Sequence, residues 1–251
     1  MPDPKSSPGA PDPRLMLITP PLADDSRGAA LAALVAGGRV ASVLLDLAPA
    51  DERALQRLAQ GYAQIAQGAG AAALAPAGLD TRIVGRAGLD GVHVSGLDGL
   101  GAALSAMRPD KVVGVGALAL RDDAMTAGEE EPDYILFGEP AADGFVRPLD
   151  WRIERIAWWA EIFNVPGAAY VAERGDVTPL VEAGADFLCF GPWVFEASDG
   201  PAILDAAQAA LDAKTARDQQ AARDSKTAAK TAAKTASKTA SKTPAKKDAP
   251  A

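Results

Sequence analysis

One short phrase occurs three times in this chain, and it limits the possible folds more than any other feature. Asp90, Asp133 and Asp186 each open a short apolar run that ends in a small residue, and each follows a helical stretch. A strand that is buried on both faces has this nearly continuous apolar pattern, because helices cover both faces of a parallel sheet. The recurrence at wide, similar spacing therefore indicates repeated βα units.

The whole chain can be divided into such units. Strands are expected at 15–19, 40–47, 71–75, 91–95, 112–117, 134–138, 167–171 and 187–191. Helices are expected between and after them, at 27–36, 51–67, 82–87, 100–107, 122–127, 150–163, 176–183 and 201–213. This alternation predicts an α/β fold, a small (β/α)8 TIM barrel. An open doubly wound sheet is the alternative, but the Gly-rich loop typical of that fold is replaced after the first strand by Thr19-Pro20-Pro21.

Composition divides the chain into three parts. Residues 1–13 are rich in Pro and Ser and are expected to form a flexible arm, and residues 14–212 form the barrel domain. Residues 213–251 contain almost no large apolar side chain and are expected to be a disordered, basic tail. From Lys226 this tail repeats Lys-Thr-Ala-Ala or Lys-Thr-Ala-Ser, which would stack like charges on one face of a helix.

The net charge of the tail is opposite in sign to that of the rest of the chain. From Lys214 onward there are ten Lys or Arg and three Asp, a net charge of +7, which leaves −15 for the rest of the chain. An acidic body is poorly suited to nucleic acid, so we expect only weak contacts of the tail with polyanions. Cys189 is the only cysteine and lies in an apolar run, as is typical of a core residue in a reducing compartment. With no long apolar run and no secretory signal visible, we expect a cytoplasmic protein that makes no contact with a membrane.

Several phrases resemble those of the thiamine phosphate synthase family and its TenI-like relatives. Leu15-Met-Leu-Ile-Thr19 resembles the family's opening strand, Leu-Tyr-Leu-Ile-Thr. The segment 90–98, Asp-Gly-Val-His-Val-Ser-Gly-Leu-Asp, resembles Asp-Gly-Val-His-Leu-Gly-Gln-Glu-Asp, and the segment 132–140 resembles Ala-Asp-Tyr-Ile-Gly-Phe-Gly-Pro. The chain is thus identified as a divergent member over about residues 14–212. The resemblance implies an enzyme that joins a pyrimidine diphosphate to a thiazole phosphate while Mg²⁺ assists the departure of diphosphate.

Most groups that this chemistry needs are replaced. A departing polyanion is stabilised by Arg, Lys, Mg²⁺ and backbone N–H groups, but Asp46 stands where the family has an Arg. Asp98 aligns with one magnesium ligand of the family, and Asp80 lies one residue from the position of another, so the resemblance implies Mg²⁺ at these two residues. Arg174 and Gly191 are the remaining candidates for phosphate binding.

Five residues are expected at the carboxyl ends of the strands, where TIM barrels carry their active sites. They are Asp46, Asp80, His93, Glu139 and Glu173. Their carboxylates would suit a cationic or amine ligand better than a phosphate, and a solvated acidic rim is the alternative. His93, the only histidine, is either an acid–base residue or a hydrogen-bonded packing residue. One Cys and one His exclude a zinc site of the usual composition.

The sequence therefore predicts a thiamine phosphate synthase-like protein with an eroded catalytic site and negligible activity in displacing diphosphate. One alternative is a non-enzymatic barrel that binds a small ligand or partner and is tethered by its cationic tail. Another is a TenI-like thiazole tautomerase, although Leu118 replaces the histidine that such proteins carry after the fifth strand. The helix at 150–163 carries Trp151, Trp158 and Trp159, which are expected to lie partly in the core; an exposed Trp among them would mark a contact with a second copy in a homodimer.

Overall fold

The computed structural model of the protein describes residues 14–76, 78–141 and 143–240. In it eight parallel strands form a closed barrel, in which each strand pairs with the next and β8 returns to pair with β1. The strands are β1 (Leu15–Ile18), β2 (Val40–Leu44), β3 (Ala72–Ala75), β4 (Gly91–Ser95), β5 (Val112–Gly116), β6 (Tyr134–Phe137), β7 (Gly167–Val171) and β8 (Phe187–Phe190). The predicted (β/α)8 barrel is confirmed.

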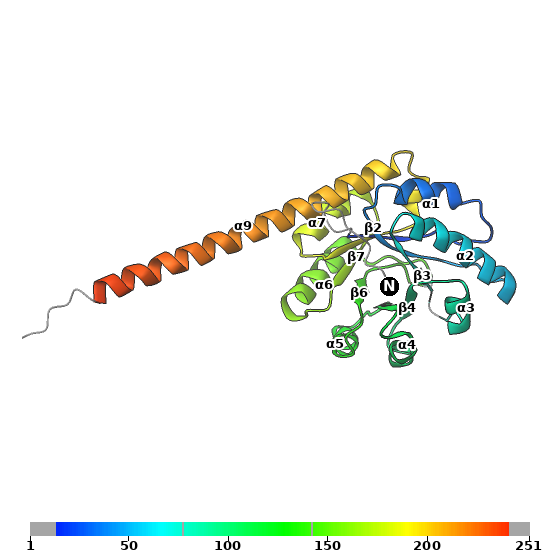
Figure 1. Cartoon of the computed structure of the whole chain (residues 1–251), viewed down its shortest axis with the longest axis horizontal. Coiled ribbons are helices and arrows are strands. Elements are labelled where there is room, and N and C mark those ends of the chain that lie inside the picture. Colours follow the sequence, from blue (N-terminus) through cyan, green and yellow to red (C-terminus); the bar gives the residue numbers. More distant parts are fainter. Residues whose placement is uncertain (1–13, 77, 142, 241–251) are drawn as a thin grey trace, which may run out of the picture. The chain divides into compact units, whose positions relative to one another are not determined.

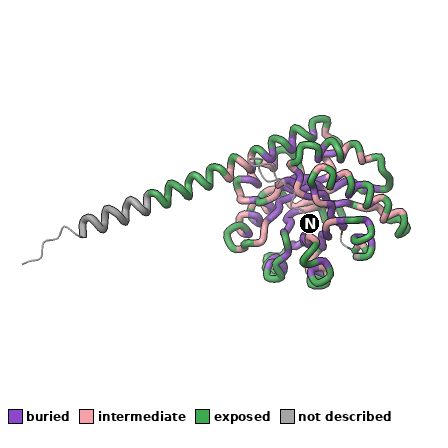
Figure 2. Tube along the Cα trace, in the orientation of Figure 1, coloured by how far each residue is buried: buried purple, intermediate pink, exposed green. Residues whose placement is uncertain are grey.

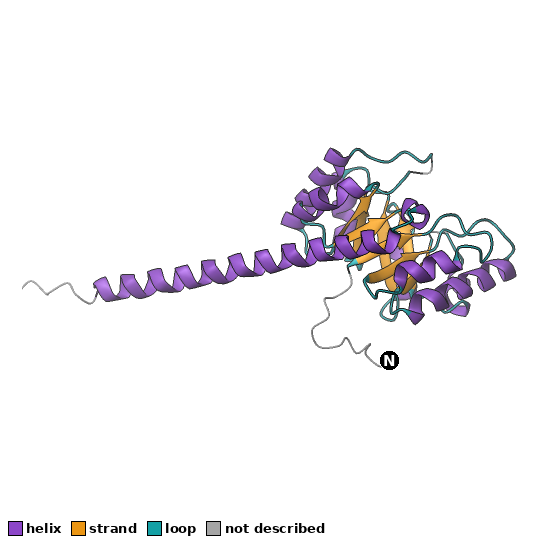
Figure 3. Cartoon of the chain, turned by 90° about the horizontal axis from the view of Figure 1, so that it is seen from above, coloured by secondary structure: helices purple, strands orange, loops and turns teal. Residues whose placement is uncertain are grey.

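Helices follow the strands and surround them, as Figures 1 and 3 show. They are α1 (Gly28–Val35), α2 (Glu52–Gly68), α3 (Thr81–Arg86), α4 (Leu100–Met107), α5 (Arg121–Glu129), α6 (Leu149–Ile162) and α7 (Val177–Glu182), which the 3-10 turn η1 (Arg174–Asp176) precedes. The short α8 (Trp193–Glu196), which the sequence did not predict, and α9 (Gly200–Ala240) end the described chain. Asp51 caps α2 by accepting a hydrogen bond of 2.9 Å from the N–H of Ala54.

The thrice-repeated aspartates have one structural role. Each lies just before an even-numbered strand, and its carboxylate accepts a hydrogen bond from a backbone N–H of the preceding strand at 2.7 to 2.9 Å. The N–H of each aspartate in turn donates to the carbonyl of the strand residue whose N–H its carboxylate binds, at 2.8 to 2.9 Å. The pairs are Asp90 with Ala73, Asp133 with Val113, and Asp186 with Gly167. These residues therefore join neighbouring strands at the amino-terminal end of the barrel.

Two apolar layers hold the barrel together, because side chains along a strand alternate between inside and outside. One layer fills the lumen with residues that include Met16, Leu74, Leu136 and Cys189. The other lies between strands and helices and includes the fully buried Trp159 of α6. Figure 2 shows the resulting pattern of buried strands and exposed outer helix faces. Among the described residues, no helix is both long and apolar enough to cross a membrane.

The last helix differs from its predicted length. The sequence predicts that it ends at residue 213, whereas α9 continues to Ala240. Ala, Lys, Arg and Gln have high helix propensity, and two pairs four residues apart, Lys214 with Asp218 and Gln220 with Asp224, interact along it. The chain divides into two compact units between Leu211 and Asp212. The predicted arm, 1–13, and the end of the predicted tail, 241–251, lie outside the described residues.

Candidate active site at the barrel mouth

A cavity of about 560 Å³ opens where the strands end at their carboxyl termini. Apolar side chains from β1, β2 and β6 form much of its wall, and its polar side chains come from Thr19, Asp46, His93, Ser95 and Glu139. Three of the predicted site residues, Asp46, His93 and Glu139, thus share one cavity. Of the described residues that line it, none is Lys or Arg.

Glu139 lies two residues after β6. Its carboxylate accepts a hydrogen bond from the N–H of Ala117, which follows β5 in a left-handed conformation with a φ of 56°. Burial raises the pKa of Glu139 from 4.5 to about 7, and the bond from Ala117 opposes this shift only in part. The carboxyl group can therefore take up or release a proton near neutral pH.

His93 occupies an inward-facing position of β4 and is only 7% exposed. Its Nδ1 forms a hydrogen bond of 2.8 Å with the hydroxyl of Tyr134. Burial lowers the pKa of His93 to about 4, so the ring is neutral at pH 7. The absence of a side chain at Gly116 creates the space for both site groups: a Cβ atom there would overlap Glu139 and lie 2.8 Å from His93 Nε2.

Asp46 lies two residues after β2, which is four strands away from β6 in the closed barrel. Its N–H donates to the hydroxyl of Thr19, which is fully buried, at 2.9 Å, and its carbonyl accepts from Leu22 at 2.7 Å. These bonds hold the backbone of the loop while the carboxylate remains at the cavity wall. Partial burial raises the pKa of Asp46, as expected for a carboxylate that no cation compensates.

The two predicted magnesium ligands lie in different surroundings. Asp98 lines a neighbouring cavity of about 450 Å³, which shares Pro76, His93 and Ser95 with the mouth cavity. Asp80 lines neither cavity, and both of its carboxylate oxygens accept hydrogen bonds from the guanidinium of Arg82.

Those bonds lower the pKa of Asp80 to about 2. Because Arg82 already occupies the Asp80 oxygens, these residues do not fit a magnesium ion held by the protein alone. Within the described ranges, no three His, Cys, Asp or Glu residues form a group suited to a metal.

The predicted residues of the seventh and eighth loops lie outside the mouth cavity. Glu173 caps η1, and Arg174 forms an exposed ion pair of 2.7 Å with Asp199. Gly191 directly follows β8 and lies close to a tyrosine: a Cβ atom there would overlap the hydroxyl of Tyr170. The structure therefore gives these three residues local structural partners and does not bring them to Asp46 and Glu139.

Sequence reasoning missed one cation. Arg147 lines a small hollow of about 160 Å³, which adjoins the mouth cavity through Ala117 and Glu139. Its guanidinium lies over the rings of Phe145 and Trp151, at 5.7 and 5.3 Å from their centres. Arg147 is visible in the sequence, but its position beside the mouth is set by the fold of the long segment between β6 and α6.

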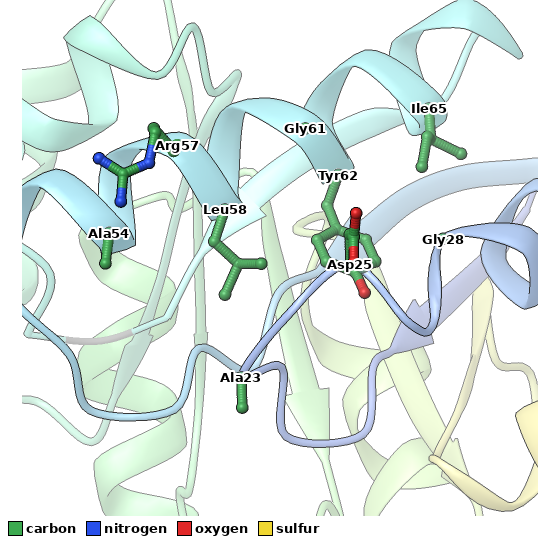
Figure 4. A pocket seen from close by; sticks show the side chains of 9 residues that line it. All are labelled: Ala23, Asp25, Gly28, Ala54, Arg57, Leu58, Gly61, Tyr62 and Ile65. Carbon is green, nitrogen blue, oxygen red and sulfur yellow. The ribbon is translucent and has the colours of Figure 1, made fainter.

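A further hollow of about 450 Å³ lies between α2 and the segment before α1, and Figure 4 shows the side chains that line it. Tyr62 is held there by two bonds: its hydroxyl donates to the carbonyl of Asp24 at 2.9 Å and accepts from the N–H of Arg27 at 3.2 Å. Asp25 and Arg57 are the charged residues of the lining. None of the predicted site residues contributes to this hollow, so the mouth cavity remains the candidate site.

Known proteins with similar sequences point to one family. A family model described as thiamine monophosphate synthase matches residues 15–190. A thiamine-phosphate synthase of Rhodospirillum centenum is 37% identical over 202 residues, which cover 77% of this chain and 96% of the relative. Another, of Hyphomonas neptunium, is 32% identical over 201 residues, with coverages of 75% and 89%.

Among solved structures, a thiamine phosphate pyrophosphorylase from Pyrococcus furiosus has the same fold. It superposes with a TM-score of 0.66 at 17% identity and covers 81% of this chain and 97% of its own. The family model over residues 15–190 and the two sequence relatives indicate the same family, and the barrel fold is consistent with it. The chain belongs to the thiamine monophosphate synthase family.

Proposed function

We propose that this protein is a thiamine phosphate synthase-like barrel whose mouth binds a small ligand but displaces diphosphate only very slowly. The observation that carries this proposal is the lining of the mouth cavity. The acidic side chains of Asp46 and Glu139 line it, and its described lining includes no Lys or Arg. Displacement of diphosphate needs the opposite arrangement, with cations around the leaving group.

Electrostatics gives the size of the effect. A unit charge about 4 Å from another contributes about 4 kcal/mol at an effective dielectric constant near 20. A carboxylate at Asp46, in place of an Arg, therefore changes attraction for a diphosphate into repulsion of similar size. Arg147 compensates little, because it lines the adjoining hollow and contacts two aromatic rings there.

The same lining favours an uncharged or cationic ligand. Ile18, Leu44 and Leu136 offer apolar contacts, while Asp46 and Glu139 offer hydrogen-bond acceptors. The ring of His93 is neutral, so it adds no positive charge. A protonated amine or an amino-substituted heterocycle fits these groups, and this supports a second candidate function, that of a binding barrel without catalysis.

Steady-state kinetics tests the main proposal. The full-length protein is supplied with Mg²⁺, pyrimidine diphosphate and thiazole phosphate, and released diphosphate is measured. We expect turnover far below roughly 1 per second, the lower end of ordinary enzymes. Turnover near that value would overturn the proposal.

Thermal-shift measurements separate the two candidates. Unphosphorylated amines and aminopyrimidines are compared with phosphorylated thiamine precursors. Stabilisation only by unphosphorylated ligands supports the binding barrel, because ligand binding to the folded state raises the melting temperature. Stabilisation only by the phosphorylated precursors supports a retained synthase site. Loss of the shift in an Asp46→Ala variant would assign the ligand to the mouth cavity.

A further inference from the structure

The latter part of α9 is a helix that buries no face. All residues from 216 to 227 are exposed, as Figure 2 shows. A helix that is polar all round depends on pairs between its own residues or on a partner outside the chain. Up to Asp224 such pairs occur, because Lys214 donates to Asp218 and Gln220 donates to Asp224, at 2.6 and 2.8 Å.

Beyond Asp224 the sequence no longer supplies the acidic members of such pairs. The next acidic residue is Asp248, and residues 226–247, which we call the lysine segment, contain seven Lys and neither Asp nor Glu. The first five of these lysines recur every four residues, from Lys226 to Lys242. Like charges four residues apart destabilise a helix. A partner that supplies negative charge would therefore stabilise this part of α9.

A neutral spacer precedes the lysine segment. The second compact unit begins at Asp212, and residues 212–225 contain three Asp and three Lys or Arg, which cancel. In helical form these 14 residues are about 21 Å long. Exposed charges further apart than about 8 Å are largely screened at physiological salt. The lysine segment can therefore bind an anion although the chain as a whole is acidic.

The residue types of the lysine segment indicate which anion it fits. Thr follows five of the seven lysines, and Lys and Thr are both residues that contact phosphates. The remaining residues are Ala, Ser and one Pro. Without an aromatic ring the segment cannot stack on unpaired bases, and without a large apolar residue it cannot insert into a membrane surface. The composition thus favours the phosphates of a duplex nucleic acid over a single strand or a lipid surface.

The helical spacing fits DNA better than double-stranded RNA. Each step of four residues along α9 advances about 6 Å and turns about 40°, so positions 226, 230, 234 and 238 lie within an arc of about 120° over about 18 Å. The phosphates of each DNA strand follow one another every 3.4 Å or so along the axis, about two for each lysine. The major groove of B-DNA admits an α-helix, whereas that of A-form RNA is narrow and deep.

We propose that the lysine segment is a binding site for duplex DNA, which it contacts as a helix through the phosphate backbone. The phosphates neutralise the lysines and remove their mutual repulsion, so DNA binding and helix formation favour each other. Phosphate contacts carry no sequence information, so the affinity is independent of base sequence. We expect a dissociation constant of about 1 to 100 μM at physiological salt, the range of such binding. The mouth cavity takes no part in it.

Fluorescence anisotropy tests the proposal. The full chain is titrated into a short labelled DNA duplex at salt concentrations between about 50 and 200 mM, and the logarithm of affinity should fall linearly with that of salt. Replacing Lys230 and Lys234 together by Gln should weaken binding at least tenfold and make the slope shallower by about 2, because two phosphate contacts are lost. Replacing Arg53 and Arg57, exposed on α2, by Gln removes the same charge and should change neither quantity. Equal effects of the two double variants would overturn the proposal.

A proline substitution tests the helical form of the bound segment. Ala233→Pro keeps every lysine but interrupts α9, so it should weaken binding at least threefold. Ala233→Ser is the matched control, since Ser237 holds the same place in the next repeat, and it should bind like the wild type. Circular dichroism should show a gain of helix when DNA is added to the wild type and a smaller gain in Ala233→Pro. Equal affinities of the proline and serine variants would overturn the proposal.

Other polyanions identify the partner. A single strand of the same length, a duplex RNA, and vesicles of phosphatidylserine and phosphatidylcholine compete with the labelled duplex, and each should compete less well than unlabelled duplex DNA. Equal or better competition by any of them would overturn the choice of duplex DNA. Analytical ultracentrifugation without DNA addresses the acidic barrel of a second copy as the partner. Self-association that the Lys230 and Lys234 variant abolishes would assign the lysine segment to that barrel and would also overturn the proposal.

Discussion

The carboxylate of Glu139 accepts a hydrogen bond from the backbone N–H of Ala117, and this bond joins the loops that follow β6 and β5 at the barrel mouth. It forms although burial disfavours the charged form of Glu139 and raises its pKa to about 7. His93, on the other side of Gly116, is buried as well, and its pKa is lowered to about 4. Two groups near the same glycine are thus both shifted toward neutrality.

Replacing Glu139 by Gln should remove one component of the pH dependence of stability. The folded protein keeps the Glu139 proton up to pH about 7, whereas the unfolded chain releases it near 4.5. Wild-type stability therefore falls as the pH rises through this window. The free energy of unfolding, measured with urea, should increasingly favour Glu139→Gln over wild type as the pH rises, by at most about 3 kcal/mol. A difference that stays constant with pH would contradict this expectation.

His93 should have the opposite effect. The unfolded chain binds a proton below pH 6.5 and the folded protein only below about 4. The contribution of His93 to wild-type stability is therefore lost as the pH falls from 6.5 to 4. His93→Gln should become relatively more stable in that direction. In the wild type the two slopes partly cancel, so the double variant with Glu139→Gln should restore a shallow profile that neither single variant shows.

Truncation of a repeated aspartate should destabilise the barrel without changing the mouth. Asp133→Ala leaves the N–H of Val113 without its acceptor and should cost about 1 to 3 kcal/mol. Asp133→Asn keeps an oxygen that can accept this bond, so it should cost less. Urea denaturation measures both variants, and equal losses would show that the hydrogen bond is not the reason. Thermal shifts with mouth ligands should be unchanged, because Asp133 lies at the amino-terminal end of β6.

The buried ion pair of Arg152 and Asp176 should be sensitive to the loss of one partner. Their atoms are 2.8 Å apart, and the side chains are 4% and 3% exposed. Arg152→Met leaves an uncompensated carboxylate and should cost about 3 to 5 kcal/mol of the free energy of unfolding. Addition of Asp176→Leu should recover part of this loss. The recovery is incomplete because Asp176 also accepts hydrogen bonds from the N–H groups of Ala172 and Glu173.

Reversal of the charge at Asp46 should create affinity for pyrophosphate. Asp46→Arg replaces repulsion by attraction at the cavity wall and should tighten binding of inorganic pyrophosphate by roughly tenfold or more, equal to about 1.4 kcal/mol. Asp46→Asn, which only removes the charge, should lie between the two. Isothermal titration calorimetry measures all three proteins. Equal affinities would show that Asp46 does not control anion binding at the mouth.

The barrel could be predicted from the sequence because its signals are local. Apolar runs opened by Asp90, Asp133 and Asp186 mark strands, and Gly or Pro residues mark the ends of helices. The length of α9 was less predictable from the spacing of its lysines, since helix propensity and pairs such as Lys214 with Asp218 act against their repulsion. The strand ends differed only slightly; β2, for example, stops at Leu44, before the predicted Leu47.

The site was predictable only in part. The sequence indicated that Asp46, His93 and Glu139 follow or lie on barrel strands, and the structure places them around one cavity. The sequence could not show that the carboxylate of Asp80 accepts hydrogen bonds from Arg82, because the direction of an exposed side chain is set by its neighbours. Nor could it show that Arg174 turns to Asp199.

The sequence alone thus determined the alternation of strands and helices, the family and the presence of Asp46 after the second strand, since these are properties of residue type and position along the chain. Only the tertiary structure decided which charges meet. Arg147 lies beside the mouth cavity, and Gly116 leaves the space that Glu139 and His93 occupy. Distance in space governs electrostatics and hydrogen bonding, and folding sets that distance independently of separation in sequence.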